Sequence, residues 1–258
     1  MKQYSIGIDS GSTFCKTVLI HNGSIIGSDI RPTGWQPAEN ALKQIKDLTA
    51  RFEVDLSQCA IGATGYGRDI IYFADKTITE ITCHARGAVF LDNTIGGVLD
   101  IGGQDCKVIK ISNGKPVDFL MNDKCAAGTG KFLDMVCSRL ELDFSEIDKL
   151  ANLEQPEKIN NMCAVFAESE IIGLIAKGKD RDVILGGVLE AITAKVTQMV
   201  VRMSFNRDVR LIMTGGLSHI QSLTTLIGDK LGVPIVTHDM SVLAGAIGAS
   251  LAVVAVGE

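Results

Sequence analysis

The fold is decided by one stretch of the chain: Ile6-Gly7-Ile8-Asp9-Ser10-Gly11-Ser12-Thr13-Phe14-Cys15-Lys16-Thr17-Val18-Leu19. Apolar residues that favour strands stand on both sides of a short turn of glycine, serine and threonine, and this pattern predicts a β-hairpin. Glycine lets the main chain approach an anion closely, and successive backbone N–H groups in such a turn can bind phosphate. The sequence therefore predicts two strands with the chemistry at the turn between them.

A second stretch repeats the first: Val98-Leu99-Asp100-Ile101-Gly102-Gly103-Gln104-Asp105-Cys106-Lys107-Val108-Ile109. At one constant offset Asp9 matches Asp100, Gly11 matches Gly102, Cys15 matches Cys106 and Lys16 matches Lys107. Such self-similarity indicates two related lobes. We therefore expect an α/β protein with lobe I at residues 1–95, completed by a C-terminal helix at 242–258, and lobe II at 96–241. The ionised aspartates only accept hydrogen bonds, so they would face a cation.

The rest of the chain alternates helical and strand patterns. A strand is predicted at residues 24–31, an amphipathic helix at 38–51, a short strand at 60–64 and a long helix at 181–202. Arg68, in the glycine-rich loop after the short strand, would either touch phosphate or pair with a local acid. Ser145 with Asp148 resembles a helix cap. A buried strand at 211–217 ends in Gly215-Gly216, where a flat ring could lie against bare backbone.

Two cysteines stand just before helical patterns, in Asn122-Asp123-Lys124-Cys125-Ala126-Ala127-Gly128-Thr129-Gly130 and Asn160-Asn161-Met162-Cys163-Ala164-Val165-Phe166-Ala167-Glu168. A helix start stabilises a thiolate, so both positions favour metal binding. An iron–sulfur cubane takes four thiolates, and two from each of two identical chains would supply them in a two-fold dimer. Cys137 lies about 18 Å along the same predicted helix from Cys125, too far to share a cluster. Two buried apolar cysteines, a zinc site or an internal disulfide are the alternatives.

Composition narrows the class of protein. The chain has 258 residues, and because 46% of them are hydrophobic it is not a disordered chain. Its net charge of -5 argues against non-specific binding of nucleic acid. The apolar segment at 242–256 is shorter than the roughly 20 residues that span a bilayer, so a packed internal helix is predicted there and no membrane association. Because a strand pattern starts at once, we expect no signal peptide and a cytoplasmic protein.

The order of the glycine-containing motifs along the chain is more specific than any one of them. Asp-x-Gly-Ser-Thr, Asp-x-Gly-Gly and a late Thr-Gly-Gly resemble the phosphate 1, phosphate 2 and adenosine motifs of the actin, hexokinase and heat-shock ATPase superfamily. With Gly65-Tyr66-Gly67-Arg68 and the two cysteine stretches added, essentially the whole chain resembles the activator ATPases (component A) of 2-hydroxyacyl-CoA dehydratases. These belong to the BadF/BadG/BcrA/BcrD ATPase family, with the ATPase subunits of benzoyl-CoA reductase.

This resemblance implies a two-lobed actin-like (ribonuclease H-like) fold with ATP in the interlobe cleft. It also implies an oxygen-sensitive homodimer that shares one [4Fe-4S] cluster, held by Cys125 and Cys163 of each chain. The residues it places at the nucleotide are Ser12, Thr13 and Lys16 near the phosphates, Asp100, Gly102 and Gly103 in the second hairpin, and Gly215 and Gly216 near adenine. It places Gln104 and Asp105 near the γ-phosphate, the attacking water and Mg²⁺. From the two hairpins we also expect the carboxylates of Asp9, Asp100 and Asp105 to order the cation and the attacking water.

The function that the resemblance implies is ATP-dependent electron transfer at low potential. Reduced flavodoxin or ferredoxin would load one electron, and ATP hydrolysis would drive it to a 2-hydroxyacyl-CoA dehydratase or a related double-cluster protein. Two other classes share the nucleotide motifs. A small-molecule kinase of the same superfamily would need a substrate pocket with a catalytic acid, and a nucleotide-binding module with a structural cluster would bind ATP without redox turnover.

Overall fold

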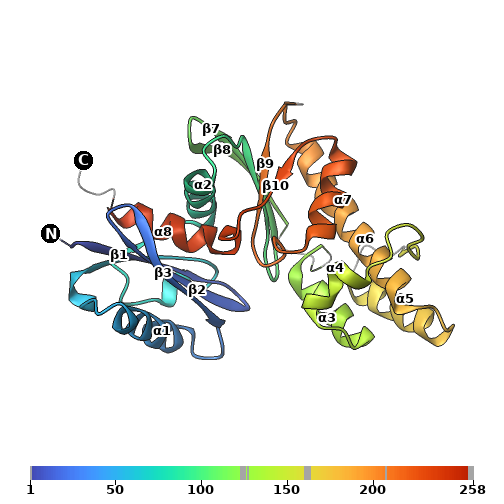
Figure 1. Ribbon diagram of the computed structural model, residues 1–258, viewed down its shortest axis with the longest axis horizontal. Coiled ribbons are helices and arrows are strands. Elements are labelled where there is room, and N and C mark those ends of the chain that lie inside the picture. The colour runs from blue at the N-terminus through green and yellow to red at the C-terminus, as the bar shows by residue number, and fades with distance from the viewer. Residues whose placement is uncertain (1, 123–125, 127, 160–163, 207, 255–258) are drawn as a thin grey trace. The chain divides into compact units, whose positions relative to one another are not determined.

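The computed structural model describes residues 2–122, 126, 128–159, 164–206 and 208–254. Cys125 and Cys163 lie outside the described residues. The chain forms two compact units (Figure 1). The first comprises Met1–Val98, Ile111–Val117 and Met240–Glu258, and the second comprises Leu99–Lys110 and Asp118–Asp239.

The first sheet has the strand order β3-β2-β1-β4-β5. Its strands are β1 (Tyr4–Ser10), β2 (Phe14–His21), β3 (Ser24–Pro32), β4 (Cys59–Thr64) and β5 (Lys76–Thr77). β2 is antiparallel to β1, with Asp9 opposite Lys16, and β4 is parallel to β1. Asn22 and Gly23 both have positive φ at the tip between β2 and β3, as a tight two-residue hairpin loop requires. The predicted hairpin and both neighbouring strands are confirmed.

Three helices pack within the first unit: α1 (Pro37–Arg51), α2 (Glu80–Leu91) and α8 (Ala244–Val254). α1 buries Ala41, Ile45 and Leu48 on the face that its periodicity predicted. α8 lies against β1, β4 and α2, and bare glycine backbone makes this contact close. A Cβ added at Gly248 would overlap the backbone of Cys83. The prediction of a packed internal helix near the C-terminus is confirmed.

The second sheet has the order β10-β9-β6-β7-β8. Its strands are β6 (Gly97–Ile101), β7 (Cys106–Ser112), β8 (Lys115–Asn122), β9 (Leu211–Thr214) and β10 (Ile235–Val236). Taken in chain order, these five strands occupy the same places as β1 to β5 in the first sheet. Asn113 and Gly114 have positive φ between β7 and β8, as Asn22 and Gly23 have in the first sheet. The repeat in the sequence therefore extends from the hairpins to the whole sheets.

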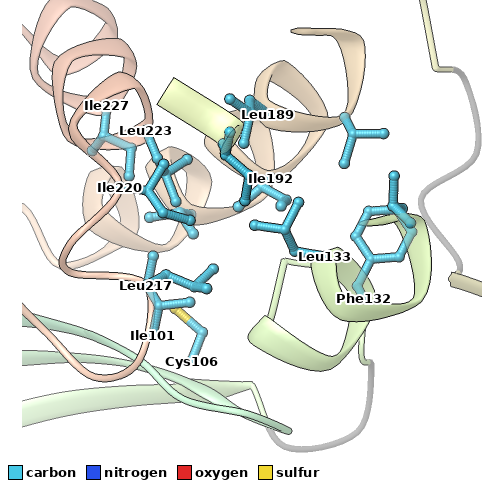
Figure 2. Close-up of a cluster of buried hydrophobic side chains, with 14 of the residues drawn as sticks. Ile101, Cys106, Phe132, Leu133, Leu189, Ile192, Leu217, Ile220, Leu223 and Ile227 are labelled. Atoms are coloured by element: carbon cyan, nitrogen blue, oxygen red, sulfur yellow. The ribbon is translucent and has the colours of Figure 1, made fainter. Parts of the chain in front are cut away.

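The helices of the second unit are α3 (Gly130–Leu140), α4 (Ile147–Leu150), α5 (Ala164–Ala176), α6 (Arg181–Arg202) and α7 (Gln221–Leu231). Figure 2 shows the core that they build on the sheet, where Leu133, Ile192 and Leu223 gather near Ile101 and Cys106. α6 is long and apolar enough to cross a membrane by length and composition, but 67% of its most apolar window is buried in the protein. We interpret α6 as the central core helix of this unit.

One predicted helix cap is wrong. Asp143, not Ser145, caps the short 3₁₀ turn at Phe144–Glu146, since its carboxylate accepts from the Ser145 N–H while Glu146 bonds back to the Asp143 N–H. The Asp148 carboxylate instead accepts from the N–H groups of Gln221 and Ser222 at 3.0 and 2.8 Å. Asp148 thus caps α7, a helix more than seventy residues further along the chain.

Candidate functional site

The first hairpin is a tight turn with a buried ion pair at its base. The Gly11 N–H donates to the Phe14 carbonyl at 3.2 Å, and the Thr33 hydroxyl donates to the Gly11 carbonyl at 2.7 Å. Asp9, 3% exposed at the end of β1, pairs with the Lys16 ammonium at 3.1 Å. Ser12 is exposed at the tip and Thr13 is half-buried. The hairpin thus presents a carboxylate, an ammonium and two hydroxyls within a few residues.

The loop after β4 packs directly on this hairpin. Gly65 has φ +94°, and a Cβ there would lie 2.6 Å from Asp9 Oδ1. The Gly67 N–H donates to the Ser10 carbonyl at 2.9 Å. Ser10 is fully buried, and its hydroxyl has no hydrogen-bond partner among the described residues. Arg68 lies 3.7 Å from both Asp69 and Glu80, so the local-acid interpretation of this arginine is the one that the geometry supports.

The second hairpin repeats the turn and adds a carboxylate. The Gly102 N–H donates to the Asp105 carbonyl at 2.9 Å, the bond that Gly11 makes with Phe14 in the first hairpin. The Lys107 ammonium pairs with Asp100 Oδ2 at 3.3 Å and with Asp105 Oδ1 at 2.6 Å. Gln104 is exposed at the tip. The second hairpin therefore brings together Asp100, Asp105 and a lysine, whereas the first has Phe14 at the position of Asp105.

Gly215 and Gly216 follow β9 and have different surroundings. Gly215 has φ +85°, and a Cβ there would overlap the Ile101 carbonyl and lie 2.7 Å from Asp100 Oδ1. An added Cβ at Gly216 would meet no atom within 4 Å. Gly215 is therefore a packing glycine, and Gly216 leaves bare backbone beside open space. This space is what a flat ring would need at the site that the sequence predicted for adenine.

The loops after β4 and β9 correspond to each other, which the sequence analysis missed. Gly65 packs on Asp9 in the first unit as Gly215 packs on Asp100 in the second. The Thr214 hydroxyl, just before Gly215, donates to Asp100 Oδ1 at 3.1 Å. The signal was present as a Thr-Gly pair after each buried strand, Thr64-Gly65 and Thr214-Gly215.

The second hairpin also anchors the start of α3. The N–H groups of Gly130 and Lys131 donate to the carbonyls of Gly102 and Gly103 at 2.9 and 2.8 Å. Both the N–H and the hydroxyl of Thr129 donate to the carbonyl of Ala126, the residue that follows Cys125. The predicted phosphate hairpin is thus connected by hydrogen bonds to the chain beside a predicted cluster cysteine.

The other five cysteines of the chain are described and buried: Cys15, Cys59, Cys83, Cys106 and Cys137. Burial raises the pKa of the Cys15 and Cys83 thiols to about 12, of Cys59 and Cys137 to about 11, and raises that of Cys106 as well. Thiols held in the protonated form are poor metal ligands. These five thiols are therefore protonated in the described structure, and the expectation that Cys125 and Cys163 bind a cluster falls on residues outside it.

No cluster of three or more His, Cys, Asp or Glu side chains within the described ranges is placed to hold a metal ion on its own. Mg²⁺ in nucleotide enzymes is usually held by one or two carboxylates together with phosphate oxygens and water. Asp9, near the end of β1, and Asp105, in the turn directly before β7, each have a carboxylate of the kind that this requirement names.

Replacing Gly215 with alanine should destabilise the protein by about 2 to 4 kcal/mol, because the left-handed backbone and the overlap with Ile101 both oppose a Cβ. Gly216→Ala is the matched control, and it should cost about 0.5 kcal/mol or less since it points into open space. Urea unfolding of the two variants measures the difference. Equal losses of stability would contradict the distinction between a packing glycine and an open one.

The chain is similar to proteins of one ATPase family over nearly its whole length. The sequence profile described as the BadF/BadG/BcrA/BcrD ATPase family matches residues 6–253. Uncharacterized protein YjiL of Escherichia coli is 41% identical, over 96% of this chain and 96% of its own. The (R)-2-hydroxyglutaryl-CoA dehydratase activating ATPase of Acidaminococcus fermentans is 37% identical, over 97% of both chains.

Solved structures agree with the sequence comparison. The crystal structure of component A of the Acidaminococcus fermentans (R)-2-hydroxyglutaryl-CoA dehydratase superposes with a TM-score of 0.91, at 36% identity and 97% coverage of both chains. The activator of the 2-hydroxyisocaproyl-CoA dehydratase from Clostridium difficile, solved with bound ADPNP, superposes with a TM-score of 0.90 at 34% identity, over 97% of this chain and 94% of its own. The predicted actin-like ATPase fold is confirmed.

Proposed function

The chain belongs to the BadF/BadG/BcrA/BcrD ATPase family, and on this basis we propose that it uses ATP hydrolysis to deliver single electrons to a partner protein. The relatives with stated roles are activators of 2-hydroxyacyl-CoA dehydratases, and one of their structures holds an ATP analogue. The proposal goes beyond the ATPase assignment in three respects: the cluster, the homodimer and the coupling between nucleotide and redox site.

Each hairpin contributes chemistry suited to a nucleotide. In the first, the Ser12 and Thr13 hydroxyls and the Lys16 ammonium are donors for phosphate oxygens. In the second, the backbone at Gly102 and Gly103 lets a phosphate approach closely. Gly216 offers open backbone to the adenine, with Gly215 holding the loop against Ile101.

Hydrolysis itself needs a cation and an oriented water. Phosphoryl transfer depends mainly on positioning and charge stabilisation. The carboxylates of Asp9, in the first hairpin, and Asp105, in the second, would each supply a ligand for Mg²⁺ or the attacking water, and Gln104, exposed at the tip of the second hairpin, would orient that water from its amide. Asp100, 2% exposed beneath the turn, supports the second hairpin from inside.

Cys125 and Cys163 would hold the iron. Cys163 directly precedes α5 and Cys125 precedes α3, and these two helices pack together with an ion pair between Arg139 and Glu168 at 2.6 Å. Two cysteines per chain complete four thiolates only in a homodimer. When bound, a [4Fe-4S] cluster supplies a one-electron carrier whose potential depends on its hydrogen bonds and exposure.

The observation that carries the proposal is the hydrogen-bonded connection between the second hairpin and α3. A change in the hairpin on ATP binding is passed to the first turn of α3, because Gly130 and Lys131 donate directly to Gly102 and Gly103. Thr129 then holds Ala126, next to Cys125. For ATP to shift this element, it must bind one of its conformations more tightly than the other.

The relatives' names indicate the partner class. A 2-hydroxyacyl-CoA dehydratase, or a dehydratase-like double-cluster protein, accepts the electron, and reduced flavodoxin or ferredoxin supplies it. The net charge of -5 gives no basis for nucleic-acid binding. We place this activity in the cytoplasm, where such carriers work.

The test is whether nucleotide changes the redox site. A coupling of about 1 to 3 kcal/mol, typical of linked sites, corresponds to a shift of roughly 40 to 130 mV for one electron. We expect the midpoint potential and the EPR spectrum of the reduced dimer to differ between the ADP and ADPNP states by an amount in this range. Redox titration under anaerobic conditions measures it.

Two glycine variants test whether the hydrogen bonds between the second hairpin and α3 carry this coupling. Gly130→Ala places a Cβ 3.3 Å from the Gly102 carbonyl and should displace the start of α3, so the nucleotide-dependent shift should fall by about half or more. Gly173→Ala in α5 meets no atom within 4 Å and should keep the shift. A potential and spectrum that stay the same in every nucleotide state of the unaltered protein would refute the coupling. A kinase or a passive nucleotide binder would give that result.

A further inference from the structure

Lys107 is a buried lysine to which the proposed function assigns no role. It lies on β7, two residues after Asp105, and is 2% exposed. Its ammonium contacts two carboxylates, Asp105 Oδ1 at 2.6 Å and Asp100 Oδ2 at 3.3 Å. A lysine is rarely buried unless it is paired, so these contacts account for its position.

The matched lysine of the first hairpin differs in two ways. The described ion pair of Lys16 is with Asp9 at 3.1 Å, and its side chain is 14% exposed against 3% for Lys107. Lys16 can therefore reach a phosphate from the surface. Lys107 is enclosed, and what it contacts is the carboxylate proposed to order Mg²⁺ and water.

We propose that Lys107 is a positioning residue for ATP hydrolysis, which fixes the Asp105 carboxylate and weakens its hold on the divalent cation. The inference rests on the proposed role of Asp105. An ammonium 2.6 Å from one carboxylate oxygen restricts the rotation of that carboxylate. The same positive charge repels a nearby cation, so Mg²⁺ binds less tightly than it would to the Asp105 carboxylate without Lys107.

Removing the charge of Lys107 should therefore tighten the binding of the divalent cation and slow ATP hydrolysis. Lys107→Met removes the charge and keeps most of the side-chain volume. The kcat for ATP hydrolysis should fall by roughly tenfold or more, with the KM for ATP within about threefold of the unaltered protein. Mn²⁺, used as a paramagnetic substitute for Mg²⁺, should bind the ADP complex about threefold or more tightly, as measured from the EPR signal of free Mn²⁺.

Two further lysine variants serve as controls. Lys107→Arg keeps the positive charge and should return the Mn²⁺ dissociation constant to that of the unaltered protein. Lys110→Met, three residues further along β7, removes a lysine whose ammonium contacts the Ser204 carbonyl and lies over the Phe205 ring. It should leave kcat and Mn²⁺ binding unchanged. A purely structural role for Lys107 would weaken Mn²⁺ binding and turnover together, and this result would overturn the inference.

A double variant decides the case if Lys107→Met does not fold. In Asp105→Asn/Lys107→Met one carboxylate is neutral, so the loss of the ammonium leaves less uncompensated charge. If Lys107 acts through Asp105, this variant and Asp105→Asn have the same kcat. A further tenfold loss in the double variant overturns the inference. If Asp105→Asn hydrolyses ATP at the unaltered rate, the proposed role of Asp105 itself is removed. If Asp105→Asn is slow but Lys107→Met has the unaltered kcat, only the role of Lys107 is overturned.

Discussion

Replacing either Cys125 or Cys163 with serine should abolish cluster binding and all electron delivery. Each substitution removes two of the four thiolates in a homodimer, and a serine hydroxyl, which stays protonated near neutral pH, is a poor replacement. Anaerobically reconstituted protein should contain about four iron atoms per dimer, and each variant close to none. Iron analysis and the visible spectrum before and after dithionite measure the loss.

Cys137→Ser and Cys59→Ser are the matched controls, since both residues are buried with a raised pKa. They should lose some stability, because each buries a hydroxyl in the place of a thiol, but they should keep the iron. Nucleotide binding should survive in the Cys125 and Cys163 variants, because neither cysteine is in a hairpin. Iron loss of the same size in Cys137→Ser, or four iron atoms per monomer, would show that the ligand assignment is wrong.

The hairpins could be predicted because their signal is local. Strand-forming residues, a glycine turn and a matched Asp and Lys lie within fourteen positions of each other at residues 6–19, so their pairing involves no distant part of the chain. The same holds for α1, whose periodicity alone gives its buried face. The local pattern also predicted α6 at its full length, from Arg181 to Arg202.

The correspondence between Gly65 and Gly215 was missed for a topological reason. The second unit has α3, α4, α5 and α6 between β8 and β9, whereas the first unit has α1 and a short 3₁₀ turn between β3 and β4. The constant offset that aligns the hairpins is therefore lost before β9. Only the shared strand order shows that Thr64-Gly65 and Thr214-Gly215 occupy equivalent positions.

Contacts between distant residues account for the other omissions. Ser145 and Asp148 have the spacing of a cap, but Asp143 forms the cap and Asp148 serves α7. Similarly, the sequence matched Lys107 with Lys16 without indicating that Lys107 reaches a second carboxylate. Spacing shows which side chains share a face, and the choice of partner depends on how the elements pack.

The hairpins are equivalent in backbone and unequal in chemistry, and this difference leads to a prediction about catalysis. Where the first hairpin has Phe14, the second has Asp105, and both accept the same turn hydrogen bond through their carbonyls. Asp9, which pairs with Lys16 at 3.1 Å, matches Asp100 of the second hairpin, so Asp105 is a carboxylate without a counterpart in the first. We therefore expect Asp105 to be the carboxylate on which the attacking water depends, with Asp9 acting mainly on the cation.

Asp105→Asn should accordingly slow ATP hydrolysis by about 10²- to 10³-fold, while iron content and the visible spectrum stay unchanged. The asparagine carbonyl can still accept from Lys107, so the loss reflects charge and basicity rather than a missing contact.

Asp9→Asn should also slow hydrolysis, and more Mg²⁺ should partly restore its rate. Asp134→Asn, which alters an exposed carboxylate 3.5 Å from Lys131, is the surface control and should hydrolyse ATP normally. Phosphate release at saturating ATP, measured over a range of Mg²⁺ concentrations up to saturation, tests all three variants, and hydrolysis at the unaltered rate in Asp105→Asn would remove this residue from the catalytic site.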